Sequence, residues 1–241
     1  MAAQDIPNQD EVQDQNSPEI LYKYLPPERI DILENMALRF GRPSDFNDTF
    51  DTHFLVPTSQ GSKAIATRLH LRGRAGILCL TERPDDHLMW VHYAHNHTGF
   101  VLGFNARAVF FQEDGRILKK VVYLHRPDVV TKPGLDVCFC KSDAWKHERE
   151  WRCVREFKQS ESREVGIEPS LVRQIIFGSQ MKDWQIARIM LYATALEMLT
   201  HTQFFRSTPV PKSWSFENTL NDISLCEHCG GDGYLMKKSE P

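Results

Sequence analysis

The sequence has little of what marks membrane, secreted or nucleic-acid-binding proteins. It contains no apolar run of about 18 residues that could span a bilayer, and Met1 to Pro18 lack the features of a secretory signal. Six cysteines in 241 residues do not suggest a disulfide framework. The formal net charge is -3, so a dedicated nucleic-acid binder, which would show a basic excess, is not indicated. We therefore expect a cytoplasmic protein with no membrane partner.

Several well-known catalytic loops are also missing. The chain has no GxxxxGK[ST] loop and no GxGxxG between a strand and a helix. It has no GxSxG elbow, and no serine or cysteine that is visibly paired with a histidine. Its glycines therefore indicate neither a phosphate-binding loop nor a hydrolase nucleophile.

The composition is that of an ordinary globular protein, with 41% apolar, 10% aromatic and 25% charged residues. Residues 1–18 are polar and acidic, which predicts a disordered tail. Residues 19–210 hold the apolar segments and predict a single domain. Residues 211–241 predict a polar C-terminal tail that carries a CxxC pair.

Strand-like and helix-like segments alternate irregularly along the predicted domain. Strands are expected at residues 19–24, 37–40, 76–81, 99–104, 117–124, 150–154, 172–177 and 203–206. Helices are expected from Pro26, over 61–72, after Asp85 or Asp86, over 143–149 and over 183–200. Regular βαβ alternation is absent, so we predict an α+β fold with a mixed, mostly antiparallel sheet and irregularly inserted helices.

The segment 42–51 is dense in turn formers and aromatic residues. Phe46 and Phe50 are apolar enough to favour burial. The polar side chains of Asn47 and Asp48 lie beside them and should then be hydrogen-bonded. The segment therefore predicts an ordered loop rather than a random surface connector.

Three histidines, at positions 92, 95 and 97, follow two aromatic residues, Trp90 and Tyr93. A metal site would need three converging ligands, and the spacing matches no HExxH motif. We expect His92 and His97 to be hydrogen-bonded structural residues and His95 to face solvent. The aromatic pair favours the core, although one ring could face a pocket.

A strand that begins at Glu150 would place Glu150 and Arg152 on one side and Trp151 on the other. An inward Glu150–Arg152 pair can be a structural ion pair. It can also be a functional carboxylate that holds a sugar hydroxyl or stabilises positive charge in a transition state. Glu148, on the preceding turn, is expected to be solvated.

The C-terminal pair Cys226 and Cys229 is separated by two residues and followed by glycines. It is half of a zinc site, because a closed structural site needs four ligands. Zinc is therefore not expected, and a flexible tail is favoured, with a metal site completed by a second chain as the alternative.

Several blocks, in order, resemble a prokaryotic family labelled a domain of unknown function. They are the LYKY run, RPSDFNDTFD, GILCLTE, LMWVHYA, HTGFVLGF, the block from Lys141 to Arg152 and the IIFG strand. The resemblance covers about residues 20–207. Gly41, Thr49 and Val91 depart from the residues that are usual in the family, and the CxxC tail lies outside its pattern.

A second, fold-level resemblance is to DarT-like ADP-ribosyltransferases. It implies NAD as substrate, with Tyr22, Lys23 and Tyr24 at the first-strand position that holds the ribose, where His or Arg is usual. Glu150 and Tyr93 would be catalytic residues. Lys23, Arg42, Asn47, Asp48 and Trp90 would bind the nucleotide, with Arg42 on its pyrophosphate. In that role Glu150 would hydrogen-bond the ribose 2′-hydroxyl and stabilise an oxocarbenium-like transition state.

Two main hypotheses follow. The chain is an NAD-using ADP-ribosyltransferase-like enzyme of a bacterial toxin or phage-defence system, with a nucleic acid or protein acceptor left open. Alternatively, it is a non-enzymatic binding or sensor module whose motif residues form a structural polar network. Metal-dependent hydrolysis by the histidines is a third option. The oligomeric state is left open.

Overall fold

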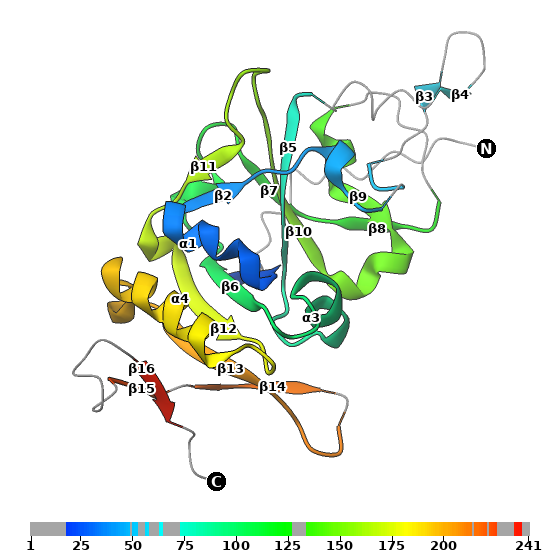
Figure 1. Ribbon diagram of the computed structural model, residues 1–241. Coiled ribbons are helices and arrows are strands. Elements are labelled where there is room, and N and C mark those ends of the chain that lie inside the picture. The colour runs from blue at the N-terminus through cyan, green and yellow to red at the C-terminus, as the bar shows by residue number, and fades with distance from the viewer. Residues whose placement is uncertain are drawn as a thin grey trace. The chain divides into compact units, whose positions relative to one another are not determined.

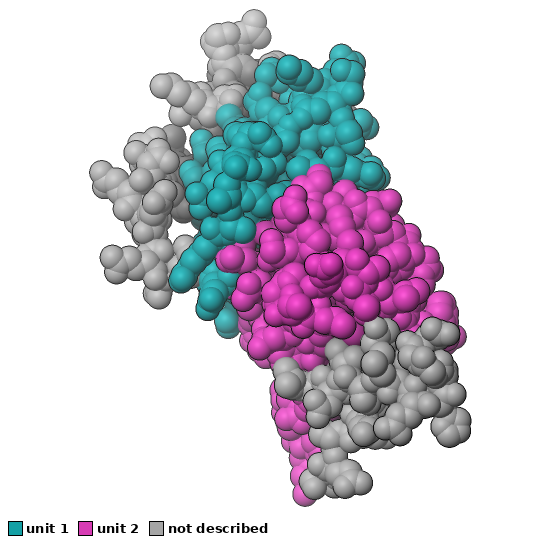
Figure 2. Space-filling view, turned by 90° about the vertical axis from the view of Figure 1, so that its left-hand side faces the viewer, with its two compact units in different colours: residues 1–19, 38–82, 106–165 teal, residues 20–37, 83–105, 166–241 magenta. Residues whose placement is uncertain are grey.

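The computed structural model describes residues 18–48, 50–52, 56–57, 63–64, 73–126, 134–213, 215–220, 222–225 and 234–237. The predicted tail over residues 1–17 and the cysteines Cys226 and Cys229 lie outside these ranges. The chain divides into two compact units, coloured separately in Figure 2. The first comprises residues 1–19, 38–82 and 106–165, and the second comprises the remainder. The single domain over 19–210 stays a prediction.

The first unit is built on three antiparallel strands in the order β5-β10-β7. Its strands are β3 (Val56–Pro57), β4 (Lys63–Ala64), β5 (Ala75–Thr81), β7 (Ile117–Lys120), β8 (Val122–Leu124), β9 (Cys140–Ser142) and β10 (Glu150–Glu156). Its 3₁₀ helices are Pro43–Asp45, Val109–Phe111, Leu135–Phe139 and Asp143–Glu148. Strand β8 pairs with β9 in parallel. Ile77, Val137 and Val154 belong to a hydrophobic core cluster of this unit.

The main strands of the second unit follow the order β14-β13-β12-β6-β1, in which only β12 and β13 pair in parallel. Figure 1 labels β14, β13, β12 and β6 of this series. These are β1 (Ile20–Leu25), β6 (Phe100–Asn105), β12 (Val172–Phe177), β13 (Gln203–Pro209) and β14 (Phe216–Leu220). Its α-helices are α1 (Asp31–Asn35), α3 (His87–Tyr93) and α4 (Asp183–Ala195). Its 3₁₀ helices are Pro27–Ile30, Pro169–Leu171 and Met198–Thr200.

Two short strand pairs complete the described elements. Strand β15 (Asp222–Leu225) pairs with β16 (Tyr234–Lys237) in the second unit. Strand β2 (Ala37–Arg39) pairs with β11 (Glu164–Gly166). Here the backbone N–H of Phe40 donates to the carbonyl of Arg163 over 2.9 Å.

Side chains from three neighbouring strands of the second unit pack against helix α3. Tyr24 is in register with Val101, and Val101 is in register with Ile176. These three residues form one buried cluster with Met89 and Trp90 of α3. Because neighbouring residues of a strand face opposite ways, α3 covers only the face to which Tyr24 points.

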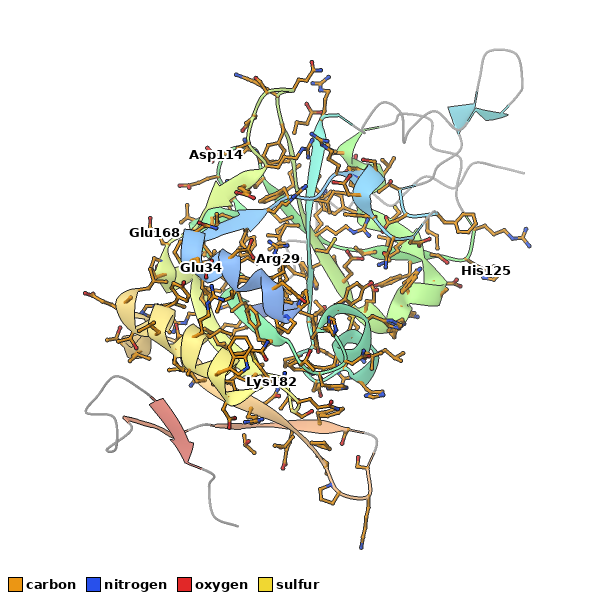
Figure 3. All side chains as sticks on the ribbon, in the orientation of Figure 1. Arg29, Glu34, Asp114, His125, Glu168 and Lys182 are labelled. Carbon is orange, nitrogen blue, oxygen red and sulfur yellow. The ribbon has the colours of Figure 1, made fainter. Side chains whose placement is uncertain are left out.

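Helix α1 is tied to α4 through one carboxylate, Glu34, which is labelled in Figure 3. Glu34 forms an ion pair with Arg188 and accepts a hydrogen bond from the Tyr192 hydroxyl over 2.8 Å. Both partners lie on α4, so a polar clamp joins two helices that are far apart in the sequence.

The predicted fold class is confirmed: the protein is α+β, with a mixed, mostly antiparallel sheet and interspersed helices. Four local expectations need correction. The strand expected over 117–124 is broken at Val121 into β7 and β8, and residues 63–64 of the expected helix 61–72 form β4. The helix expected over 183–200 ends at Ala195. Strand β14 was not expected and lies in the predicted tail. No helix among the described residues is long and apolar enough to cross a membrane.

Candidate functional site

Local backbone geometry places Glu150 and Arg152 on the same buried face of the first unit. The 3₁₀ helix before β10 ends at Glu148, and the left-handed backbone of the next residue, Arg149 (φ 45°), turns the chain into the strand. Along β10, Glu150 pairs in register with Thr81 and Arg152 with Cys79, both on β5. The expected inward pair is thereby confirmed, since Glu150 is 4% exposed and Arg152 is fully buried.

Arg152 is the centre of a buried charge network. Its guanidinium donates to both carboxylate oxygens of Asp51, over 2.9 and 2.7 Å, in a bidentate pair. The same group donates to Glu150 over 2.8 and 3.0 Å and to the carbonyl of Cys138 over 2.7 Å. The guanidinium thus joins β10 to the Asp51 loop and to the 3₁₀ helix that carries Cys138, and it also binds Glu150 on its own strand.

Lys141, on β9, completes the network from the other side of Glu150. Its Nζ donates to Glu150 Oε2 over 3.1 Å and also contacts the carboxylate of Glu148. Glu148 is only 3% exposed, so the expectation that it is solvated was wrong. The physical reason is that Glu148 ends the 3₁₀ helix against β5, where its carbonyl accepts from Thr81 Oγ1 over 2.6 Å and its carboxylate faces Lys141.

The electrostatics of the network favour the ionised forms. Burial alone would raise the pKa of Glu150, but Arg152 and Lys141 outweigh burial, and the pKa of Glu150 is lowered to about 2. Burial would lower the pKa of Lys141, yet Glu150 and Glu148 raise it overall. The pKa of Arg152 is also raised, because Glu150 and Asp51 outweigh its desolvation. Glu150 is therefore a charged, fully paired carboxylate at neutral pH.

The loop that carries Asp51 lies over this network. The ring of Phe46 lies 5.6 Å from the Arg152 guanidinium carbon, and Phe46 is half-buried as expected. Phe50 is 72% exposed, so its expected burial was wrong. Its backbone N–H donates to Asp48 Oδ1 over 2.9 Å, which confirms a hydrogen bond at Asp48. Asn47 is exposed.

Three of the remaining nucleotide-site candidates lie in the second unit, where they do not share one face of the sheet, and the fourth lies in the first unit. Trp90 is fully buried, and its indole N–H donates to the Pro84 carbonyl over 3.0 Å. Tyr93 is half-buried and packs against the same cluster as Trp90. Lys23 lies between Tyr22 and Tyr24 in β1, so its side chain points to the sheet face opposite the Trp90 cluster. Arg42, in the first unit, is exposed just before a 3₁₀ helix.

Of the three histidines, one lies as expected and two do not. His97 is 6% exposed and stacks on Trp90 and Phe216, with ring centroids 5.6 and 4.6 Å apart. Its Nδ1 has no hydrogen-bond partner among the described residues, so the expected hydrogen bond is not found there. His92 and His95 are both exposed, as expected for His95. Within the described ranges, no group of three His, Cys, Asp or Glu could hold a metal ion.

Sequence reasoning missed Asp51, Lys141 and Cys138 as members of the network. Lys141 offered no signal from strand alternation, because it lies on β9, a different strand from Glu150 and Arg152. Asp51 offered no signal, since it precedes Arg152 by 101 residues and reaches it through the folded loop.

Comparison with known proteins gives one partial match. A family described as "Protein of unknown function (DUF2971)" matches residues 89–132. This stretch runs from α3 through β6 and β7 to β8, and over it the chain is similar to that family. No curated protein and no solved structure matches the chain. The DarT-like resemblance and the individual motifs find no support in these comparisons.

Proposed function

We propose that this chain is a non-enzymatic binding or sensor module in which the motif residues around Glu150 form a structural polar network. One observation carries the proposal. Both oxygens of Glu150 are engaged by Arg152 and Lys141, in a site where the carboxylate is 4% exposed. A carboxylate in this state joins β9, β10 and the Asp51 loop.

The enzyme hypothesis would require more from Glu150 than this geometry offers. A glutamate that stabilises an oxocarbenium-like transition state must reach the ribose, where it accepts a hydrogen bond from a sugar hydroxyl. Here the acceptor positions of Glu150 already face Arg152, Lys141 and the Cys79 thiol. Opening the network to admit a sugar would leave buried charges without partners, which is costly.

The ligand that we propose for the module is a small nucleotide, with NAD the first to test, and the cytoplasm is its proposed location. The support is chemical: Arg42 is exposed, and a guanidinium fits a pyrophosphate bidentately. NAD would then be bound without being consumed.

The test combines stability with NAD turnover in the full chain. Glu150→Gln keeps the shape of the side chain but leaves Arg152 and Lys141 without a buried counter-charge. We expect it to lower the free energy of unfolding by about 3 kcal/mol, measured by urea denaturation. The matched control is Glu156→Gln on the same strand, whose exposed ion pair with Arg74 should contribute about 0–1 kcal/mol.

The binding module and the NAD-consuming enzyme predict opposite results for unfolding and NAD turnover. The structural role predicts that Glu150→Gln unfolds more easily and that wild-type protein does not hydrolyse NAD, as measured by nicotinamide release. A wild-type protein that releases nicotinamide, together with a Glu150→Gln variant that folds as stably but is inactive, would establish the enzyme instead.

A further inference from the structure

Three arginines gather where β2 meets the segment that leads into β11, all within the first unit. Arg39 ends β2, and Arg42 follows it three residues later. Arg163 is brought beside them because the Phe40 backbone N–H donates to its carbonyl over 2.9 Å. We refer to Arg39, Arg42 and Arg163 as the arginine cluster.

The side chain of Arg163 is held in place before any ligand arrives. Its guanidinium donates to the carbonyls of Ala75 and Gly73 over 2.8 and 3.1 Å. It also lies over the Phe157 ring, 5.0 Å from the centroid. A cation fixed by backbone acceptors and an aromatic ring loses little side-chain entropy when it binds an anion.

The arginine cluster is short of negative charge. The carboxylate of Asp45 lies 4.0 Å from the guanidinium of Arg39, and both side chains are about half exposed. The other acid nearby, Glu161, is engaged by Arg155 and by the Lys158 backbone N–H.

The cations also act on one another. Partial burial lowers the pKa of Arg163, and the like charges of Arg42 and Arg39 lower it further, although the negative charge of Asp45 opposes them. Among the described residues, Arg42 makes no ion pair. Three arginines facing one exposed carboxylate leave about two uncompensated positive charges, and an anion would relieve this repulsion.

We propose that the arginine cluster binds the diphosphate group of a small ligand, with Arg163 as the fixed anchor and Arg42 and Arg39 closing on the phosphate oxygens. This inference rests on the proposed binding function and names the part of the ligand that is recognised. Two net positive charges match a diphosphate, and planar guanidinium groups form paired hydrogen bonds with phosphate oxygens. The weak Arg39–Asp45 contact would yield to the anion.

A small ligand fits this surface better than a nucleic acid does. A long polyanion needs a row of positive charges along its path, whereas the acidic Asp45 lies beside Arg39 in this cluster. The chain as a whole carries a formal net charge of -3. The attraction is therefore local and suits a compact anion.

The experiment is calorimetric titration of the full chain with inorganic pyrophosphate, ADP, adenosine and a short single-stranded RNA. We expect pyrophosphate and ADP to bind and adenosine not to bind. Arg42→Gln, an exposed position whose loss should leave the fold intact, should weaken pyrophosphate binding about tenfold, the loss of one charged contact. The matched control is Arg173→Gln, an exposed arginine of the second unit, which should bind as the wild type does.

Three results would overturn the inference: no pyrophosphate binding, equal binding by wild type and Arg42→Gln, or tighter binding of a short single-stranded RNA than of ADP. These readouts do not involve Glu150. A failure here therefore leaves the unfolding result for Glu150→Gln unchanged, and NAD turnover by the wild type would contradict the proposed function without touching pyrophosphate binding.

Discussion

At the scale of single residues, alternation along a strand is the strongest guide that the sequence offers. It correctly placed Glu150 and Arg152 inward, because side chains two apart on a strand share a face. It could not identify Asp51, whose pairing with Arg152 depends on how the loop after β2 folds back. The solvation expected for Glu148 was inferred from its position on a turn and was wrong, because Lys141 supplies a buried counter-charge there.

His97 offers a test of residue-scale electrostatics in the second unit. The groups that face it are the rings of His87, Trp90 and Phe216. Burial lowers the pKa of His97 from its ordinary value of 6.5, and the neighbouring His87 lowers it further. At this residue the folded chain therefore binds fewer protons than the unfolded chain, so stability is full above pH 6.5 and falls as the pH drops below it.

We expect His97→Phe, which keeps a ring in the stack but cannot titrate, to remove this loss of stability. Urea unfolding at pH 7.5, 6.5 and 5.5 measures it. His92→Phe, at an exposed position on α3, should keep the wild-type slope. If the His97→Phe slope matches the wild-type slope over this range, His97 is not the titrating group.

At the scale of elements, the start of α3 shows how a cap is selected. The sequence left Asp85 and Asp86 open as capping residues. Asp86 is the cap: its Oδ1 accepts from the Met89 backbone N–H over 3.1 Å, which satisfies one free donor of the first turn. Asp85 instead pairs with Arg83, with contacts of 2.8 Å.

Asp86→Ala should therefore lower the free energy of unfolding by about 1 kcal/mol, because the first turn of α3 loses its acceptor. Asp85→Ala removes a partly exposed ion pair and should contribute less, about 0–1 kcal/mol. Thermal or urea unfolding of the two variants, measured side by side, shows which of the two aspartates stabilises the protein more. A larger effect at Asp85 would contradict this assignment of the cap.

Element boundaries were less predictable than element types. The apolar run at 117–124 looks continuous, but it pairs with two different strands. Its first part pairs with β10 as far as Val121, whose N–H donates to the Glu150 carbonyl over 2.9 Å, and its last three residues pair with β9 instead. Strand β14 was missed because its residues are mostly polar, and its place comes from pairing with β13, with Phe216 opposite Pro209. Local sequence does not reveal which strands pair in this way.

At the scale of the whole molecule, irregular alternation of strand and helix segments was enough to give the fold class. It was not enough to give the strand order. In the second unit β12 lies between β6 and β13, and in the first β10 lies between β5 and β7, so sequence neighbours are often not sheet neighbours. Such long-range pairing is set by burial of faces that a single segment does not reveal. In the candidate site only the inward pair of Glu150 and Arg152 was predictable, because both residues lie on one strand.

The buried network makes a prediction for the acid stability of the whole chain. The pKa of Glu150 is about 2 in the folded protein and 4.5 for an ordinary glutamate. Its stabilising effect is therefore complete well above pH 4.5 and is lost as the pH falls through 4.5 toward 2.

Glu150→Gln has no such group to protonate. The difference in unfolding free energy between wild type and Glu150→Gln should narrow by about 2 kcal/mol between pH 7 and pH 3, measured by urea denaturation. Glu156→Gln, at the exposed end of the same strand, should show little narrowing. A difference for Glu150→Gln that stays constant over this range would mean that Glu150 is not ionised against Arg152 and Lys141, and the structural role would fail with it.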